Sequence, residues 1–132
     1  MSKPTYLYKI IPSSDPPPEP LPEKLPLSKL DSSSGFIHLS TAAQIPGTLK
    51  RFFMEEPLVY ILKISYDPLE KDIRWEDPEA KVCGERGGEG MFPHLYNGGR
   101  LGRGEVESQA VWENNGVGWD QALERAESWL IY

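Results

Sequence analysis

Leu58-Val59-Tyr60-Ile61-Leu62-Lys63-Ile64-Ser65-Tyr66 is the stretch of this chain that decides its fold. It has a two-residue period and is rich in branched and aromatic side chains, which is typical of a β-strand. The Asp67-Pro68 pair that follows is a turn signal. We therefore expect a half-buried strand over residues 58–66, and the rest of the chain is interpreted around it.

Four further segments have strand character and two have helical character. We expect strands over residues 5–11, 36–39, 73–76 and 106–112. One helix begins near Thr41, which has Gln44 at the spacing of a capping box, and Pro57 ends it. Its apolar positions are Ile45, Leu49, Phe52 and Phe53, and Pro46 is expected to delay or kink its start. A C-terminal helix is expected over residues 119–132.

The segments between these elements are rich in residues that favour turns and loops. Seven of the thirteen prolines lie in residues 12–26, which predicts a proline-rich surface loop, and a proline ligand for a partner domain is the minor alternative. A helical turn near residues 27–30 precedes a turn at 31–35. Eight of the twelve glycines lie in residues 84–104, which predicts a glycine-rich loop, and a turn is expected at 114–116. Together the elements predict one α+β domain over residues 1–132.

Composition limits the classes of function. The chain has 132 residues and a net charge of −6, which argues against binding to a nucleic-acid backbone but leaves a small nucleotide open. A lone cysteine, Cys83, cannot form an intramolecular disulfide. Neither a leader peptide nor an apolar run of membrane-spanning length is present, so we expect a cytoplasmic protein without membrane contact. No metal-ligand spacing is found.

The two histidines of the chain give the best indication of a site. His38 lies in Gly35-Phe36-Ile37-His38-Leu39-Ser40-Thr41, and His94 lies in Phe92-Pro93-His94-Leu95-Tyr96. Apolar neighbours draw each imidazole toward the interior, where it needs a hydrogen-bond partner. Each motif alone fits a structural histidine equally well. Together they predict one shared pocket, with both imidazoles close enough to contact one small ligand.

Several neighbours of the histidines are candidate ligand-binding residues. Ser40 is expected on the same strand face as His38, where a hydroxyl and an imidazole can hold a ribose or a phosphate. Tyr96 offers a ring and a phenol. Trp75 and Glu76 offer a stacking surface and a carboxylate, although such a pair is common. Arg100 lies in a glycine-bearing stretch suited to anions, but its spacing fits no known phosphate loop.

These motifs resemble a known family. Tyr8-Lys9-Ile10, the string from Gly35 to Ala42, Trp75-Glu76 and the string from Phe92 to Tyr96 occur in the order found in the DUF952 family of small proteins. The resemblance covers about residues 5–112. It implies a fold similar to ADP-ribosyltransferases, with split, strongly bent β-sheets, flanking helices and a cleft that holds NAD in active relatives. Lys9, His38, Ser40, Thr41, His94 and Tyr96 match the motif positions.

The resemblance implies a cleft between the two histidine segments for NAD, ADP-ribose or a related phosphorylated nucleoside. In a catalytic version, His38 and Ser40 hold the ribose, Tyr96 packs on the base and His94 is the acid or base; the reaction is ADP-ribosyl or phosphate transfer. Common transferases of this type also use a late-strand glutamate, and neither Glu105 nor Glu107 lies in a matching motif. The alternative is a non-catalytic module that binds a metabolite or a protein.

Overall fold

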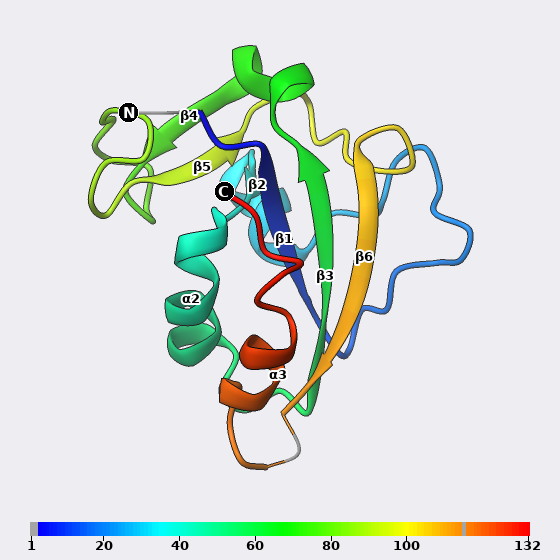
Figure 1. Ribbon diagram of the computed structural model, residues 1–132. Helices are drawn as coiled ribbons and strands as arrows, with labels where there is room; N and C mark the ends of the chain where they lie inside the picture. The colour runs from blue at the N-terminus through cyan, green and yellow to red at the C-terminus, as the bar shows by residue number, and fades with distance from the viewer. Residues whose placement is uncertain (1–2, 115) are drawn as a thin grey trace.

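An antiparallel sheet of three strands forms the centre of the molecule. The computed structural model describes residues 3–114 and 116–132. Strands β1 (Tyr6–Pro12), β3 (Leu58–Ser65) and β6 (Val106–Glu113) lie in the order β1-β3-β6, with a register shift between Lys63 and Ile64. The segment expected to be a strand at residues 58–66 therefore contains the central strand, β3 (Figure 1).

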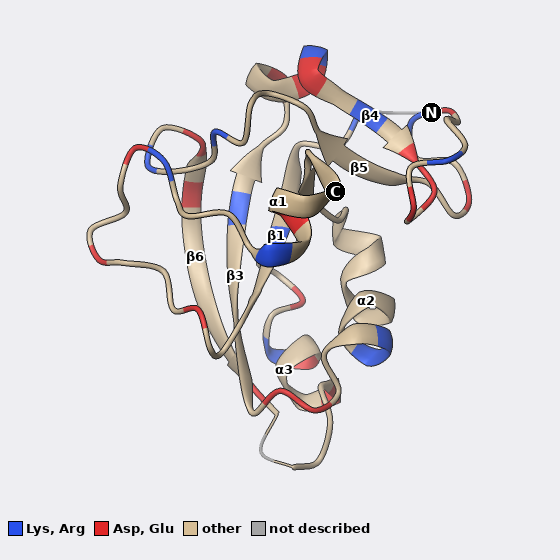
Figure 2. Cartoon of the chain, turned by 180° about the vertical axis from the view of Figure 1, so that it is seen from behind, with Lys and Arg blue, Asp and Glu red and all other residues tan. Residues whose placement is uncertain are grey.

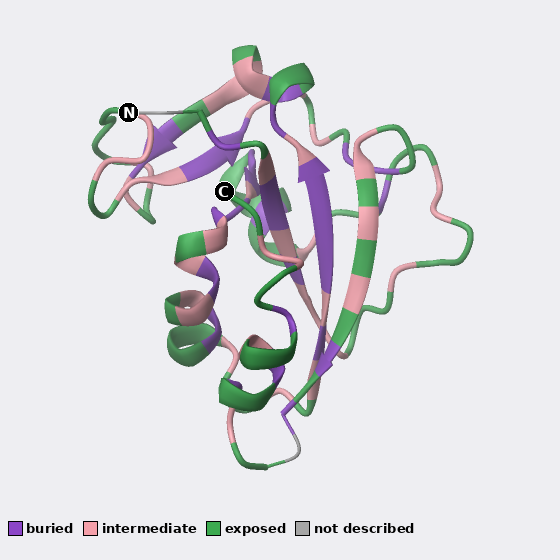
Figure 3. Cartoon of the chain, in the orientation of Figure 1, coloured by how far each residue is buried: buried purple, intermediate pink, exposed green. Residues whose placement is uncertain are grey.

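Strand β3 is buried on both faces, which corrects the expectation of a half-buried strand. Val59 and Ile61 pack with residues of two helices, whereas Leu62 and Ile64 belong to a second cluster on the opposite side. The interior of β3 and much of β1 are buried, and β6 at the edge is more exposed (Figure 3). The central position explains the difference, because both faces of this strand are covered by other elements.

A second, smaller sheet carries both histidines. Strands β2 (Ile37–His38), β5 (Phe92–Leu95) and β4 (Ile73–Glu76) pair antiparallel in the order β2-β5-β4. Strand β5 lies inside the stretch 84–104 that was predicted to be a glycine-rich loop. That prediction is wrong for Phe92–Leu95, because this segment finds ladder partners on both sides, while the glycines before and after it form the loops.

Short helices cover the sheets. Helix α1 (Lys29–Ser34) is capped by Ser28 and ended by Gly35 at φ 82°, so the expected turn at 31–35 is mostly helical. The Thr41–Gln44 capping box is present at the start of the 3-10 helix η1 (Ala42–Gln44), which leads into α2 (Ile45–Phe52). Pro46 is tolerated because it lies in the first turn of α2.

Two expectations about the helices are wrong. Phe52 is 62% exposed, so it is not part of the apolar face of α2. Helix α3 (Asp120–Arg125) is much shorter than 119–132, although Trp119, Ala122 and Ala126 pack with α2 against the sheet (Figure 1). The 3-10 helix η2 (Asp67–Asp72) links β3 to β4. Asn115, the middle of the turn expected at 114–116, lies outside the described residues. No described helix is long and apolar enough to cross a bilayer.

The proline-rich segment is a loop, as expected, but its end packs on the body of the protein. Residues 14–16 and 18–20 are exposed, whereas Leu25 is buried in the core and its amide donates to the carbonyl oxygen of Leu101 at 2.8 Å. A Cβ atom added to the neighbouring Gly102 would overlap the backbone carbonyl oxygens of Pro22 and Glu23. The loop is therefore fastened at its C-terminal end.

This fastening gives a first prediction. Gly102→Ala should lower the free energy of unfolding by about 1–3 kcal/mol, because a backbone clash in a packed region forces the loop to shift. The control is Gly47→Ala in α2, where an added Cβ meets nothing within 4 Å and the expected change is a small stabilisation. Urea unfolding of both variants measures the difference. Equal stability of the two variants would show that the loop does not press on Gly102.

Candidate functional site

The register of the small sheet places the two histidines side by side. His38 on β2 is the cross-strand partner of His94 on β5, and His94 is the partner of Arg74 on β4. Directly opposed residues share a sheet face, and so do residues two apart on one strand. The face therefore also includes Phe36, Glu76 and Tyr96. The opposite face carries Ile37, Trp75 and Leu95, which lie in the core.

Ring contacts hold the histidine face together. The ring centroids of His38 and His94 are 5.2 Å apart, in an edge-on arrangement. Phe36 stacks on His94 at 4.3 Å and also contacts His38 at 4.5 Å. The expectation that the two imidazoles lie close together is confirmed. The two segments are adjacent paired strands, however, so the site is a sheet face. The expectation of a cleft between the two segments is therefore wrong.

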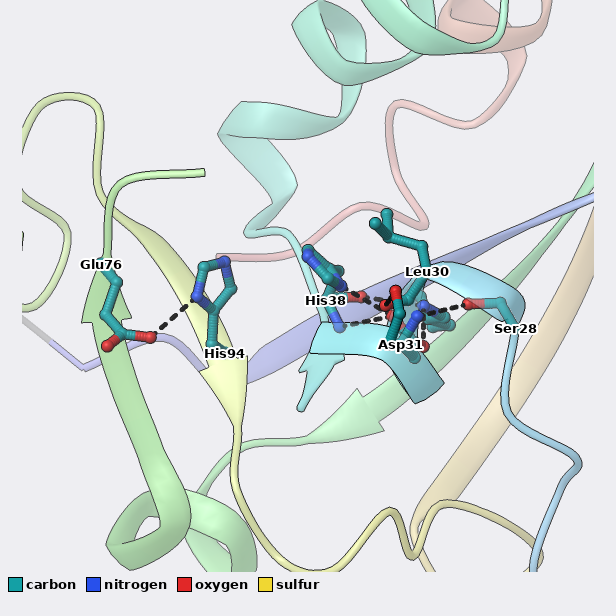
Figure 4. A network of polar contacts seen from close by, with 8 residues as sticks. Ser28, Leu30, Asp31, His38, Glu76 and His94 are labelled. Atoms are coloured by element: carbon teal, nitrogen blue, oxygen red, sulfur yellow. Dashed lines mark hydrogen bonds and ion pairs between the residues drawn. The ribbon is translucent and has the colours of Figure 1, made fainter. Parts of the chain in front are cut away.

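Each histidine is oriented by a carboxylate. Nδ1 of His38 lies 2.7 Å from Oδ1 of Asp31, and Nδ1 of His94 lies 2.9 Å from Oε1 of Glu76 (Figure 4). Because a carboxylate only accepts hydrogen bonds, the proton of each neutral imidazole is placed on Nδ1. In both rings Nε2 is then the atom that can accept a proton or a hydrogen bond.

Asp31 connects His38 to Lys9. Nζ of Lys9 donates to Oδ2 of Asp31 at 2.6 Å and to the carbonyl oxygen of His38 at 3.2 Å, and the amide of His38 donates to Oδ1. Burial lowers the pKa of Lys9. Burial also acts to raise the pKa of Asp31, but the hydrogen bond with His38 and the charge of Lys9 outweigh it, so this pKa is below its usual value. Asp31 is thus held as a carboxylate.

Glu76 holds Tyr96 as well as His94. The Tyr96 hydroxyl donates to the same Oε1 atom at 2.6 Å. Burial and this carboxylate raise the pKa of Tyr96 to about 12. Burial lowers the pKa of His94, an effect that the hydrogen bond with Glu76 only partly opposes. His94 is therefore neutral at physiological pH.

The two histidines differ in accessibility. The side chain of His38 is 23% exposed, whereas that of His94 is 1% exposed. A ligand that approaches this face meets His38 first, and His94 lies behind it.

Four predicted site residues have other roles in the structure. Ser40 pairs through its backbone with Tyr8 of β1, at 2.8 and 2.9 Å, so it joins the large sheet. Thr41 caps η1. Trp75 lies in the core because adjacent strand residues face opposite sides, so it cannot act together with Glu76. Nε of Arg100 donates to the carbonyl oxygen of Asn97 in its own turn.

The late glutamates lie elsewhere. Oε1 of Glu105 accepts from the amide of Gly102, and Oε1 of Glu107 accepts from the hydroxyl of Ser65 at the end of β3. Within residues 3–114 and 116–132, no cluster of His, Cys, Asp and Glu is suited to a metal ion. A groove of about 420 Å³ lies between β6 and α3, lined in part by Trp112 and Trp129, on the other sheet.

Sequence reasoning missed three residues of the site. Phe36 and Arg74 are each two positions from a residue that was identified, so the strand period could have found them. Asp31 precedes His38 by seven residues and lies in α1, and nothing in the local sequence marks it.

Comparisons with known proteins find similar solved structures and one matching family. The crystal structure of protein CC0527 from Caulobacter crescentus is 27% identical, with a TM-score of 0.62, and the match covers 91% of this chain and 99% of that one. Its solution NMR structure is 26% identical, with a TM-score of 0.59, over 89% and 96% of the two chains. No curated protein matches. The family model of DUF952, a protein of unknown function, matches residues 22–112, which include both histidine motifs. This chain belongs to the DUF952 family.

Proposed function

We propose that the histidine face binds a ribose-containing nucleotide, with NAD and ADP-ribose as the first candidates, and acts on it by proton transfer. One observation carries this proposal: two imidazoles lie 5.2 Å apart, and a carboxylate fixes Nδ1 of each. The same arrangement of imidazole and carboxylate is used by enzymes that need a histidine in one tautomer. The choice of nucleotide comes from the family resemblance, which implies an ADP-ribosyltransferase-like fold.

In the proposal, the roles of the two histidines follow from the exposure of their rings. His38 is the accessible ring, so in the proposal its Nε2 accepts a hydrogen bond from a ribose hydroxyl and takes up or returns the proton. Asp31 orients His38. His94 stacks on Phe36 and is held by Glu76. The proposal therefore treats His94 as a positioning residue in the conformation described.

The reaction proposed is group transfer in which His38 carries the proton. Its Nε2 takes the proton of an attacking hydroxyl or water while the new bond forms at the ribose carbon or the phosphorus. The bond to nicotinamide or to the leaving oxygen then breaks, and an oxygen leaving group takes up the proton. A common ADP-ribosyltransferase uses a glutamate against the charge that builds on the ribose, and the structure pairs Glu105 and Glu107 with groups outside the histidine face. A non-catalytic binding module is the second candidate, and the burial of His94 favours it.

Calorimetric titration and a thermal-shift assay with NAD, ADP-ribose, AMP and 2′,3′-cyclic AMP test the proposal. A ligand at a hundred times its Kd should stabilise the protein by about 2.7 kcal/mol. His38→Ala should weaken its binding by about 1–3 kcal/mol, the usual effect of leaving a polar group unpaired. Arg103→Gln, at an exposed and weakly paired arginine, is the control and should bind normally.

Turnover separates the two candidates. Release of nicotinamide, ribose or phosphate is measured by chromatography. Release that is abolished in His38→Ala supports the enzymatic candidate. Binding without turnover supports the module. If the parent protein binds none of the four compounds, the nucleotide proposal is wrong.

A further inference from the structure

Arg74 occupies a position on the histidine face that neither the sequence motifs nor the family resemblance mark as functional. It is exposed, and it lies opposite His94 in the register of β4 and β5. Its guanidinium carbon lies 4.4 Å from the centroid of the Tyr96 ring. Tyr96 is itself fixed by its hydrogen bond to Glu76. The guanidinium is therefore positioned by a ring that cannot turn freely.

Stacking leaves the donors of an arginine available. A guanidinium that lies flat against an aromatic ring keeps its N–H groups, which point outward in its own plane, available for a phosphate or a carboxylate. Among residues 3–114 and 116–132, no carboxylate forms an ion pair with Arg74, although the chain has 20 acidic residues against 14 basic ones. In such a chain a positioned arginine without an acidic partner is suited to an anion from outside.

Two other candidate cations are already engaged. Lys9 is paired with Asp31, and Arg100 donates within its own turn. The blue positions in Figure 2 show a basic residue on β4 at the side of the small sheet. Arg74 is therefore the cation that the geometry favours for a ligand on the histidine face.

We propose that Arg74 forms an anion subsite that binds the phosphate of the nucleotide whose ribose contacts His38. This inference rests on the proposed function and names the residue that binds the phosphate of its substrate. His38, His94 and Arg74 form a row across three adjacent strands, and the strand spacing of about 4.8 Å gives the row a length of about 10 Å. A nucleotide that holds its ribose at His38 can then reach Arg74 with its phosphate, passing over the buried His94 ring.

Paired ligands test the subsite. Isothermal titration of the parent protein, Arg74→Gln and Arg74→Lys with ADP-ribose, which carries the anion, is compared with NMR titration of adenosine, which does not. Arg74→Gln should weaken the binding of ADP-ribose by about ten- to a hundredfold and leave the binding of adenosine unchanged. Arg74→Lys should recover only part of the loss, because lysine keeps the charge without the planar donors. Arg103→Gln is the charge-matched control and should bind both compounds like the parent.

The outcomes separate this inference from the proposed function. If the parent binds ADP-ribose and Arg74→Gln binds it equally well, the proposed anion subsite is wrong and the nucleotide site stands. The same holds if Arg74→Gln weakens the binding of adenosine and of ADP-ribose by the same factor. If Arg100→Gln shows the selective loss in place of Arg74→Gln, the subsite lies in the glycine-bearing turn. If the parent binds neither compound, both proposals fail.

Discussion

Asp31→Ala is expected to lower the free energy of unfolding by about 3–5 kcal/mol, the range found when one partner of a buried ion pair is removed. Asp31 is 2% exposed and accepts from Nζ of Lys9, from Nδ1 of His38 and from the backbone amide of His38. Without the carboxylate, a largely buried ammonium and a ring N–H lose their partner together. Urea unfolding at neutral pH measures the change.

Two further variants give this result its meaning. Asp67→Ala removes an exposed carboxylate that lies 3.7 Å from Lys3, so it should change stability by less than about 1 kcal/mol. Lys9→Met combined with Asp31→Ala removes the unpaired charge and should recover much of the loss. If Asp31→Ala matches Asp67→Ala, Asp31 does not hold Lys9 and His38 in the folded protein.

The large elements of the fold could be predicted from local sequence. The strand at 58–66 and the Thr41–Gln44 cap are set by short-range chemistry, namely a two-residue period and a reciprocal hydrogen bond. The burial of β3 on both faces could not be predicted, because it depends on which elements fold back over Val59 and over Leu62. Strand β5 was missed for a similar reason: glycines surround Phe92–Leu95, and its pairing partners are distant in sequence.

The histidine face was predicted in part. The closeness of His38 and His94 followed from two similar motifs in a small domain, and the structure confirms it. The same strand period that places Glu76 on this face excludes Trp75, so one error lay in not applying the alternation. Asp31 could not be found from the strand period, because it reaches Lys9 and His38 only when α1 packs beside β1 and β2. No local sequence pattern indicates this packing.

Glu76→Ala is expected to lower the free energy of unfolding by about 2–4 kcal/mol. Oε1 of Glu76 accepts from Nδ1 of His94 at 2.9 Å and from the Tyr96 hydroxyl at 2.6 Å, so truncation leaves two donors without an acceptor, one of them on a side chain that is 1% exposed. Each unsatisfied buried group costs about 1–3 kcal/mol. Glu76→Gln keeps an oxygen that can accept from both donors, so it should retain most of the stability.

The pH dependence tests whether the charge of Glu76 sets the pKa values of His94 and Tyr96. In the parent, the pKa of His94 is lowered from 6.5, so the unfolded state takes up this proton first and stability is lost as the pH falls from above 6.5 through the folded pKa. Glu76→Gln removes a charge that favours protonated His94, so the pKa of His94 should fall further. The pKa of Tyr96 should fall from about 12 toward its ordinary 10.0.

NMR titration of the His94 and Tyr96 ring signals measures both shifts, and urea unfolding at pH 7.5 and at pH 5.5 measures the stability. The charge-matched control is Glu107→Gln, at an exposed carboxylate that accepts from Ser65 and should leave both ring titrations unchanged. If Glu76→Gln keeps the free energy of unfolding but lowers the pKa values of His94 and Tyr96, the Glu76 carboxylate holds these two side chains. An unchanged Tyr96 titration in Glu76→Gln would mean that the phenol is not bonded to Glu76, and the support proposed for His94 and Arg74 would be lost with it.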